Sequence, residues 1–450
     1  MDMVGLIPQF GGALFTILAF VAALTIIVFI HEYGHYIIGR WSGIRAEVFS
    51  IGIGPVLWSR LDKRGTKWQI AAFPVGGFVK FLGDANAASA GVDGEVLQGL
   101  SDAERRASMP GAPLWARAST VAAGPVFNFI LSIVIFAGFA LSQGVATDPL
   151  TVARLPDMPG LENGLKPGDE ILAINGVATP GLAGFAEYVA QLPEQKTLPY
   201  TVGRDGETVD VLAPHPYPPL VGAVSPGSAA LDAGLEAGDV ILSMDGQEVA
   251  TFAQMRDVVG QSGGRALALR VWRPDQDGGQ EMDFTLVPRK IDLPLAEGGF
   301  ETRWLIGVSA QFLFEPASRN LGPLEAVKAG VRQTAYIISA SVSGLYHMIA
   351  GNISSCNLRG PIGIAQTSGQ AAAQGPSDFI WFIGVLSTAV GFLNLFPIPI
   401  LDGGHLAFFA YEAVARRKPS DRALNILMGI GLVLVLSLMV FGLTNDLRCP

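Results

Sequence analysis

The chain has 450 residues, of which half are hydrophobic and 15% are charged. With a positive mean hydropathy, this balance indicates an integral membrane protein that also carries a soluble part. The formal net charge of −9 argues against nucleic acid as a partner. The two cysteines, Cys356 and Cys449, show no C-x-x-C spacing, which argues against a zinc knuckle or redox motif and leaves their pairing open.

The first expected membrane span runs from about Phe10 to Ile30 and leads directly into an H-E-x-x-H motif formed by His31, Glu32 and His35. On a helix the two histidines share one face, so both can bind one zinc ion while Glu32 activates water. Ionisable residues are rare in membrane helices and generally have a function there. The motif therefore predicts a zinc site at membrane depth.

A β-rich stretch follows this span. Segments 47–58 and 66–81 alternate partly and are rich in Val, Ile, Phe and Trp, with a Pro-Val-Gly-Gly turn signal at 74–77. They predict a β-hairpin beside the first span, and the apolar residues of 70–81 indicate that it contacts the membrane. Residues 84–112 are rich in Ala, Gly, Asp and Ser, and are expected to form a flexible loop.

Three later segments also reach the roughly 20 apolar residues of a spanning helix; they cover about 118–141, 379–401 and 423–444. The connections 39–117 and 404–422 carry ten and four Lys or Arg residues, so the positive-inside rule places both in the cytoplasm. Both termini then lie outside. So does the acidic block 143–376, which holds 25 Asp or Glu against 15 Lys or Arg.

One further segment, Thr334–Gly351, has no acidic or basic residue except His347. Because it is short and rich in Ser, it is expected to be an amphipathic helix on the membrane surface. The alternative is a fifth span, which would reverse the direction of the third.

The acidic block contains an internal repeat. The pattern G-L-x-x-G-D-x-I-L-x-x-[ND]-G begins at Gly164 and recurs 70 residues later at Gly234. It resembles the pattern of bacterial PDZ domains, which bind extended peptides by adding a strand to a sheet edge. The alternative is that the copies act only as steric bulk.

A catalytic zinc needs a third protein ligand. The favoured candidate is Asp402, because it closes the third apolar run and because two histidines with one carboxylate form an established ligand set. His31 lies 21 residues beyond Phe10 and Asp402 lies 23 beyond Phe379, so both reach the cytoplasmic third of the bilayer. His405 is the alternative third ligand. Asp402 could also be only a helix cap before Gly-Gly.

Together these motifs resemble the site-2 protease family of intramembrane zinc metalloproteases, and the two PDZ-like copies narrow the likeness to its bacterial RseP-type branch. The motifs are the H-E-x-x-H run, F-P-x-G-G-F-V-K-x-L-G-D at 73–84, G-P-x-x-N at 124–128 and N-x-x-P-x-P-x-L-D-G at 394–403. The resemblance implies regulated proteolysis of single-span membrane proteins, such as an anti-sigma factor already cleaved outside, and of signal-peptide remnants. It also implies a bacterial inner membrane location, with both termini and the PDZ copies periplasmic and the active site near the cytoplasmic side.

The resemblance also implies residue roles. His31, His35 and Asp402 would bind one zinc ion per chain, with Glu32 as general base. Polar contacts to the substrate or the oxyanion would come from Asn128 and Asn394. A strand that pairs with the substrate backbone would comprise Gly76, Gly77, Phe78, Val79 and Lys80.

The expected fold is a multi-pass α-helical membrane protein with four transmembrane helices, a membrane-associated β-hairpin and two extracytoplasmic PDZ domains. The predicted divisions are 1–42 (first span with the zinc motif), 43–112 (hairpin and loop), 113–142 (second span), 143–216 and 217–292 (PDZ domains), 293–376 (linker with the interfacial helix), 377–403 (third span), 404–422 (cytoplasmic loop) and 423–450 (fourth span and tail). The alternative function is a membrane-tethered PDZ adaptor with a non-catalytic zinc site. A transporter is disfavoured because the spans do not repeat one another.

Overall fold

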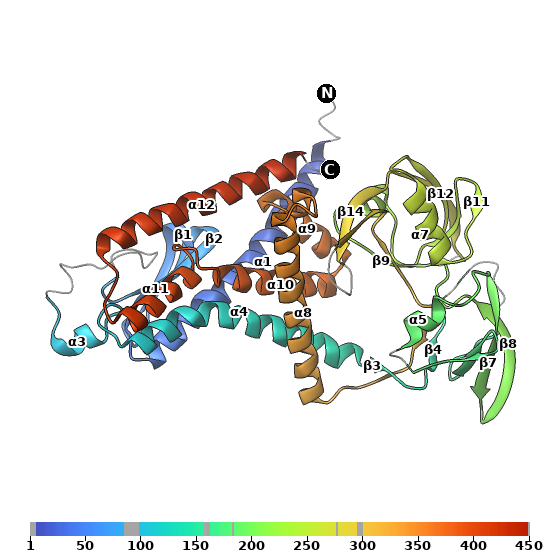
Figure 1. Ribbon diagram of the computed structural model, residues 1–450, viewed down its shortest axis with the longest axis horizontal. Helices are drawn as coiled ribbons and strands as arrows, with labels where there is room; N and C mark the ends of the chain where they lie inside the picture. Colours follow the sequence, from blue (N-terminus) through green and yellow to red (C-terminus); the bar gives the residue numbers. More distant parts are fainter. Residues whose placement is uncertain are drawn as a thin grey trace. The chain divides into compact units, whose positions relative to one another are not determined.

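The computed structural model describes residues 6–84, 99–156, 158, 163–181, 184–275, 278–294 and 300–448. The chain forms two compact units, and each is described by itself. The helical unit comprises residues 1–138, 324–345 and 358–450, and the β-rich unit comprises residues 139–323 and 346–357 (Figure 1).

Among the described residues, four helices are long and apolar enough to cross a membrane. They are α1 (Leu6–Trp41), α4 (Leu114–Gln143), α10 (Pro376–Asn394) and α12 (Asp421–Arg448). The prediction of four spans is confirmed by length and composition. Further described helices outside the β-rich repeats are α3 (Asp102–Arg106), α8 (Pro323–Ile349), α9 (Pro361–Gln374) and α11 (Asp402–Ala415).

The third span is shorter than the sequence suggested. Helix α10 ends at Asn394 instead of continuing to residue 403, and α11 begins at Asp402 after a non-helical segment. Pro397 and Pro399 lie in that segment. Proline has no amide hydrogen for the helix ladder and disfavours helical backbone in the residue before it, so two prolines in three residues end the helix.

The predicted hairpin is a more elaborate sheet. In β1 (Ala46–Leu61), residues 48–51 pair on one side with 67–70 of β2 (Lys67–Phe81), with both numbers rising together. On the other side they pair with 77–80 in antiparallel register. Residues 56–61 pair with the other edge of 67–71. Two bent strands therefore give four rows, in the order 56–61, 67–71, 46–51 and 77–81. Left-handed glycines, Gly52 at φ +86° and Gly54 at φ +94°, make the bend in β1 possible.

The expected surface helix belongs to a longer element. Helix α8 spans Pro323–Ile349 and crosses α4 in Figure 1. Gly330 of α8 lies at the contact with α4. A Cβ at Gly330 would lie 2.5 Å from the carbonyl oxygen of Ile133, so only glycine permits this approach. Helix α8 is not among the candidate spans of the described chain. Its position at the membrane surface stays a prediction.

The β-rich unit contains the sequence repeat as a structural repeat. Each copy forms a four-stranded antiparallel sheet with the same order, β6-β5-β7-β8 in the first and β11-β10-β12-β13 in the second. The first copy comprises β5 (Glu170–Ile174), β6 (Val177–Ala178), α5 (Phe185–Val189), β7 (Thr197–Arg204) and β8 (Glu207–Pro214). The second comprises α6 (Ala229–Ala233), β10 (Val240–Met244), β11 (Gln247–Glu248), α7 (Phe252–Gln261), β12 (Leu267–Arg273) and β13 (Gln280–Leu286).

The repeated letters produce the same backbone in both copies. Asn175 and Gly176 have φ of 53° and 75°, and Asp245 and Gly246 have φ of 49° and 77°. Two consecutive left-handed residues are the requirement of a tight hairpin turn, and Asn-Gly and Asp-Gly satisfy it at low cost. The motif therefore fixes the β5–β6 and β10–β11 turns locally.

A downstream segment completes both copies. It contains β14 (Arg289–Pro294), β15 (Phe300–Leu305), β16 (Val308–Ala310), β17 (Glu315–Pro316) and β18 (Ser318–Arg319). Strand β16 pairs with β9 (Val221–Val224), β17 with β4 (Val152–Arg154) and β18 with β3 (Val145–Ala146). Strands β16, β17 and β18 thus pair with strands of the β-rich unit, although the predicted division at 292 places them in a linker.

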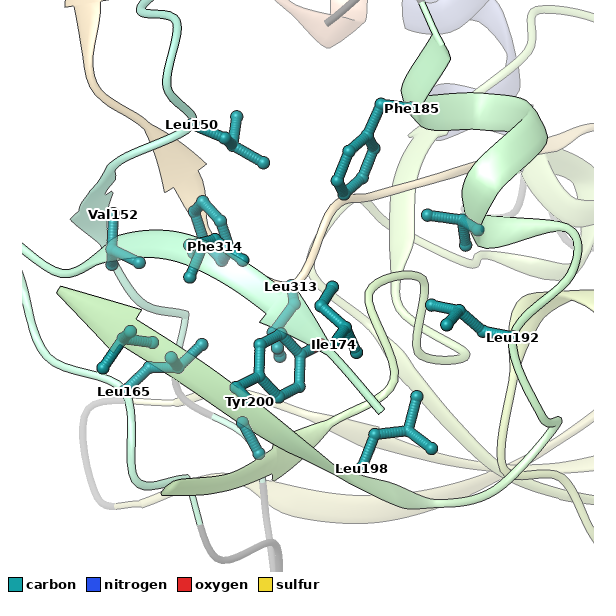
Figure 2. Close-up of a cluster of buried hydrophobic side chains, with 14 residues drawn as sticks. Leu150, Val152, Leu165, Ile174, Phe185, Leu192, Leu198, Tyr200, Leu313 and Phe314 are labelled. Carbon is teal, nitrogen blue, oxygen red and sulfur yellow. The ribbon is translucent and has the colours of Figure 1, made fainter. Parts of the chain in front are cut away.

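The hydrophobic cores show the same sharing. Leu313 and Phe314 pack among Ile174, Tyr200 and their neighbours in the core of the first copy (Figure 2). Ile306 belongs to the core of the second copy. One downstream stretch therefore supplies buried side chains to two folds that precede it in the chain.

Two sequence expectations fall partly outside the described residues. Of the predicted loop 84–112, residues 85–98 are not described, while Ser101 and Glu104 form a reciprocal capping box on α3. Cys356 lies in the 3-10 turn η3 (Ser355–Asn357) and is disulfide-bonded. The chain's other cysteine, Cys449, lies outside the described residues.

Candidate metal centre

Two imidazoles of α1 face one another. His31 and His35 are one helical turn apart, and their Nε2 atoms lie 3.2 Å from each other. The helix brings them together because residues four apart share a face. The i, i+4 spacing thus produces the expected pair.

Asp402 joins this pair from the first turn of α11. Its Oδ2 lies 3.1 Å from His31 Nε2 and 3.5 Å from His35 Nε2. Within the described chain, these three residues form a group whose ligand atoms all lie within 4.8 Å of one another. His405, the alternative third ligand, is not in that group. The three residues predicted from the sequence are therefore brought together.

The break between α10 and α11 is what places Asp402 here. Two glycines follow it, and a Cβ on Gly403 would lie 2.3 Å from the carbonyl oxygens of Leu395 and Phe396. A Cβ on Gly404 would lie 2.3 Å from the Ile398 carbonyl oxygen. Only glycine lets the start of α11 lie this close to the preceding segment.

Helix α11 is also anchored at its other half. Glu412 receives two hydrogen bonds from the guanidinium of Arg117 on α4, at 2.6 and 3.0 Å. The Arg117 side chain is buried and stacks over Phe409 at 5.1 Å from the ring centre. A two-fold charge-assisted contact of this kind fixes orientation as well as distance.

Helix α4 lines the other side of the histidines. The backbone carbonyl of Thr120 lies 2.9 Å from His35 Nδ1, and Asn128 Nδ2 lies 3.1 Å from His31 Nδ1. Between them, Gly124 leaves no room for a side chain: a Cβ there would lie 2.4 Å from His35 Nε2 and 2.8 Å from His31 Cε1. The two rings therefore fill the space that a larger residue at 124 would need.

The arrangement fits a cation. The Thr120 carbonyl can only accept, so His35 carries its proton on Nδ1 and presents a lone pair at Nε2. This lone pair faces Asp402 Oδ2, a buried atom that has no hydrogen-bond partner among the described residues. Lone pairs and a carboxylate oxygen that converge in this way repel one another unless a positive ion lies between them. Two histidines and one carboxylate form a ligand set of catalytic zinc.

Glu32 lies beside the edge of the sheet. The backbone N–H of Val79 faces its carboxylate, and a Cβ on Gly77 would lie 3.2 Å from Glu32 Cγ. A glycine at 77 therefore permits β2 to run against α1 at the level of the histidines. Of the other predicted strand residues, Gly76 approaches Ile53, while Phe78 is half-buried in the ladder.

The remaining predicted side chains have partners of their own. Lys80 forms an ion pair with Glu47 at 3.3 Å. Asn394 donates to the carbonyl of Val390 in its own helix at 3.1 Å. Asn128 is fully buried, against His31. The amide of Asn128 therefore contacts a predicted metal ligand, and its contact with the substrate or the oxyanion stays a prediction.

Sequence reasoning missed several residues of the centre. Thr120 acts through its backbone, which no residue type reveals. Gly124 stands in the G-P-x-x-N motif, but its need for space is visible only once α1 lies against α4. Arg117 and Glu412 are 295 positions apart. The signal in the sequence was an arginine directly before an apolar run, where a charged side chain needs a partner.

Comparison with known proteins agrees with this centre. The model of "Peptidase family M50" matches residues 19–438. A protein of Agrobacterium fabrum named as a zinc metalloprotease is 34% identical over 436 residues, covering 96% of this chain and 95% of the relative. A zinc metalloprotease of Rhizobium meliloti is 35% identical over 439 residues, covering 96% of each. The "Regulator of sigma-E protease RseP" of Salmonella typhimurium is 31% identical over 462 residues, covering 96% of this chain and 98% of that protein.

Proposed function

The chain belongs to peptidase family M50 and is a zinc metalloendopeptidase; we propose that it cleaves single-span membrane proteins inside the bilayer. The observation that carries this proposal is the position of the metal centre. His31 and His35 lie within the candidate span Gly12–Trp41, and the third ligand follows directly on the break after another span. A protease centre built on spanning helices is suited to peptide bonds at membrane depth.

The proposed roles follow from the geometry. His31, His35 and Asp402 hold one zinc ion, which when bound supplies Lewis-acid chemistry that polarises a peptide carbonyl and makes water more acidic. Glu32 accepts a proton from the attacking water and returns it to the leaving amine. The Val79 amide, which faces the Glu32 carboxylate, would help to hold it in place.

Substrate backbone would pair with the edge of β2. Residues 77–81 form the outermost row of the sheet and, in the described chain, pair only with β1. This row lies against α1 at Glu32. A helix must unwind before its peptide bond can be cut, and strand pairing would satisfy the backbone groups that unwinding exposes. We assign this role to Gly76 through Lys80, with Asn394 as a polar contact nearby.

The sheet carries apolar side chains suited to the membrane. Ile53, Leu57, Trp58 and Phe73 are 51%, 71%, 52% and 60% exposed. Exposed apolar clusters of this kind mark a membrane or partner contact. They support the placement of the sheet against the bilayer, where irregular backbone is tolerated only against protein or a water-filled cavity.

The substrate class and the location are also proposed. The Salmonella relative is named as a regulator of sigma-E, which supports regulated intramembrane proteolysis of a pre-cleaved anti-sigma factor, together with signal-peptide remnants, by this chain. The lysine and arginine counts support a bacterial inner membrane protein with both termini and the β-rich unit in the periplasm, and the active site toward the cytoplasm.

The β-rich repeats are proposed to be PDZ domains that act as an external size filter. They would admit only substrates whose external domain has been removed. Strand β3 at the start of this unit pairs with β18 at its end, so a short linker could replace residues 145–319 without separating the flanking chain. This deletion should let intact substrates be cut. Unchanged selectivity for trimmed substrates would exclude the filter.

Proteolysis itself is tested with Glu32→Gln. This change removes the base and keeps the size of the side chain, so the purified full chain should retain zinc while cleavage of a single-span substrate is lost. Substrate fragments should accumulate in membranes that contain the wild-type chain and not in membranes that contain Glu32→Gln. Full cleavage by Glu32→Gln would contradict the assignment. If the wild type binds about one zinc per chain but cleaves no substrate, the alternative function is favoured, a membrane-tethered PDZ adaptor with a non-catalytic zinc site.

A further inference from the structure

Asn128 lies on α4 with its amide nitrogen 3.1 Å from His31 Nδ1 and with no exposed surface. We infer that Asn128 is a positioning residue, which holds the proton of His31 on Nδ1 and thereby directs Nε2 to the metal. This inference rests on the proposed zinc centre and adds a residue that sets its geometry.

His35 shows how such control works. Its Nδ1 lies 2.9 Å from the Thr120 carbonyl oxygen, which can only accept. The proton of a neutral His35 is therefore on Nδ1, and Nε2 is left as a ligand. A hydrogen bond at the nitrogen away from the metal is the usual way in which a protein fixes the tautomer and orientation of a histidine ligand.

His31 needs the same tautomer. Its Nε2 is the atom that converges with His35 Nε2 at 3.2 Å and with Asp402 Oδ2 at 3.1 Å. A neutral imidazole that binds metal through Nε2 carries its proton on Nδ1. The group opposite Nδ1 must then be an acceptor.

The amide of Asn128 supplies that acceptor when its oxygen faces His31. The two ends of an amide have the same shape, so hydrogen bonding decides which end faces the ring. An N–H2 group toward Nδ1–H would place two donors together and leave Oδ1 buried without a partner, as that atom is in the described structure. The oxygen-inward orientation makes Nδ1–H the donor and Asn128 Oδ1 the acceptor.

The surroundings hold Asn128 in place. Its backbone carbonyl accepts hydrogen bonds from the hydroxyls of Ser132 and Ser387, at 3.0 and 2.9 Å. Gly391 of α10 lies so close that a Cβ there would be 3.1 Å from Asn128 Cβ. A side chain fixed in this way transmits its orientation to the imidazole it contacts. Partners of this kind typically change metal affinity by about 10–100-fold when they are removed.

The test measures zinc affinity of the full-length chain in detergent, by competition with a chromophoric chelator, and the visible spectrum after cobalt is substituted for zinc. Asn128→Asp keeps an acceptor of nearly the same shape and should bind zinc within about threefold of wild type. Asn128→Leu should bind about 10–100-fold more weakly and give an altered cobalt spectrum. Gly138→Ala on the same helix is the control, because nothing lies within 4 Å of its added Cβ, and it should leave both readouts unchanged.

The outcomes separate this inference from the proposed function. Wild-type zinc affinity in Asn128→Leu would overturn it, and so would a loss in Asn128→Asp as large as in Asn128→Leu. The second comparison remains decisive if the leucine variant is poorly folded, because an aspartate that cannot donate would fail wherever a donor is required. A wild-type chain that binds no zinc would contradict the proposed metal centre itself.

Discussion

Two buried carboxylates, one in each unit, have opposite surroundings. Asp169 of the first repeat accepts hydrogen bonds from Arg204 Nε and Nη2 and from the Lys166 amide, each at 2.7 Å. Asp402 of the helical unit has a buried oxygen with no hydrogen bond, and two imidazoles opposite it. Buried charges need partners. The first carboxylate is therefore paired with an arginine of its own unit, whereas the second faces two imidazole nitrogens with which it could hold a metal ion.

The second repeat also contains a buried aspartate that is paired with an arginine. Asp239 accepts from Arg273 Nε and Nη2 at 2.7 and 2.8 Å and from the Glu236 amide at 2.9 Å. In both repeats, the aspartate of the Gly-Asp step in the motif forms an ion pair with an arginine 34 or 35 positions later. This pair has a structural role in each repeat. A buried aspartate is a candidate for function when its partners are missing, and burial by itself does not identify it.

The largest effect is expected from Asp402→Asn. Loss of the anionic ligand should reduce zinc affinity by more than the roughly 100-fold seen for partners outside the ligand shell, and cleavage should fall below detection. The wild type should gain thermal stability when zinc is added, because a ligand that binds only the folded state stabilises it. The variant should not. A zinc-dependent rise in its melting temperature equal to that of wild type would remove Asp402 from the site.

Gly124→Ala should be nearly as severe. The new Cβ would occupy space 2.4 Å from His35 Nε2, so the imidazoles must move and zinc binding should be lost. Gly138→Ala on the same helix is the control, since nothing lies within 4 Å of its added Cβ. There, alanine should raise stability by up to about 1 kcal/mol. Zinc titration of both variants shows whether zinc binding is lost because of the space at position 124 or because any glycine of the helix is replaced by alanine. Equal zinc binding by the two variants would contradict the prediction.

Asp169→Asn should affect stability and leave zinc affinity unchanged. It removes the counter-charge of Arg204 at a carboxylate that is itself buried, so the free energy of unfolding should fall clearly. Asp283→Asn is a surface comparison, because its contact with Arg270 is exposed and is worth at most about 1 kcal/mol. Denaturant unfolding of the full chain, followed by a probe in the β-rich unit, measures both. Equal losses in the free energy of unfolding would show that burial does not make the Asp169–Arg204 pair more stabilising than the Asp283–Arg270 pair.

The smallest effect concerns pH. Burial raises the pKa of the Asp169 carboxyl, but the hydrogen bonds from Arg204 and the Lys166 amide outweigh it and hold that pKa below its ordinary value. A lowered folded pKa gives stability that is full above the unfolded value of about 3.9 and is lost as pH falls toward the folded one. The melting temperature of the β-rich unit should therefore decline below about pH 4, and less steeply in Asp169→Asn. If the melting temperatures of wild type and Asp169→Asn fall in parallel as pH is lowered, the prediction is wrong.

The helices, the repeat and the two histidine ligands could be predicted because each depends on local spacing, whereas Asp402 was predicted from its place at the end of another apolar run. A run of apolar residues sets the four spans, and residues four apart set the His31–His35 pair. The Asn-Gly and Asp-Gly turns determine their hairpins through backbone preference. The extent of the third span was wrong because its hydrophobicity continues past the point where Pro397 removes a helical hydrogen bond.

The chemistry of the centre can thus be seen in the order of residues alone: two histidines on one helix face, a glutamate beside them and a carboxylate after another span. The atoms that complete the centre depend on how the helices pack. The Thr120 carbonyl, the space at Gly124 and the amide of Asn128 reach the histidines because α4 packs on α1. The sharing of residues 306–319 between two repeats likewise depends on contacts across more than 80 positions. Contacts of that range follow from burying surfaces against one another, and no short pattern of residues encodes them.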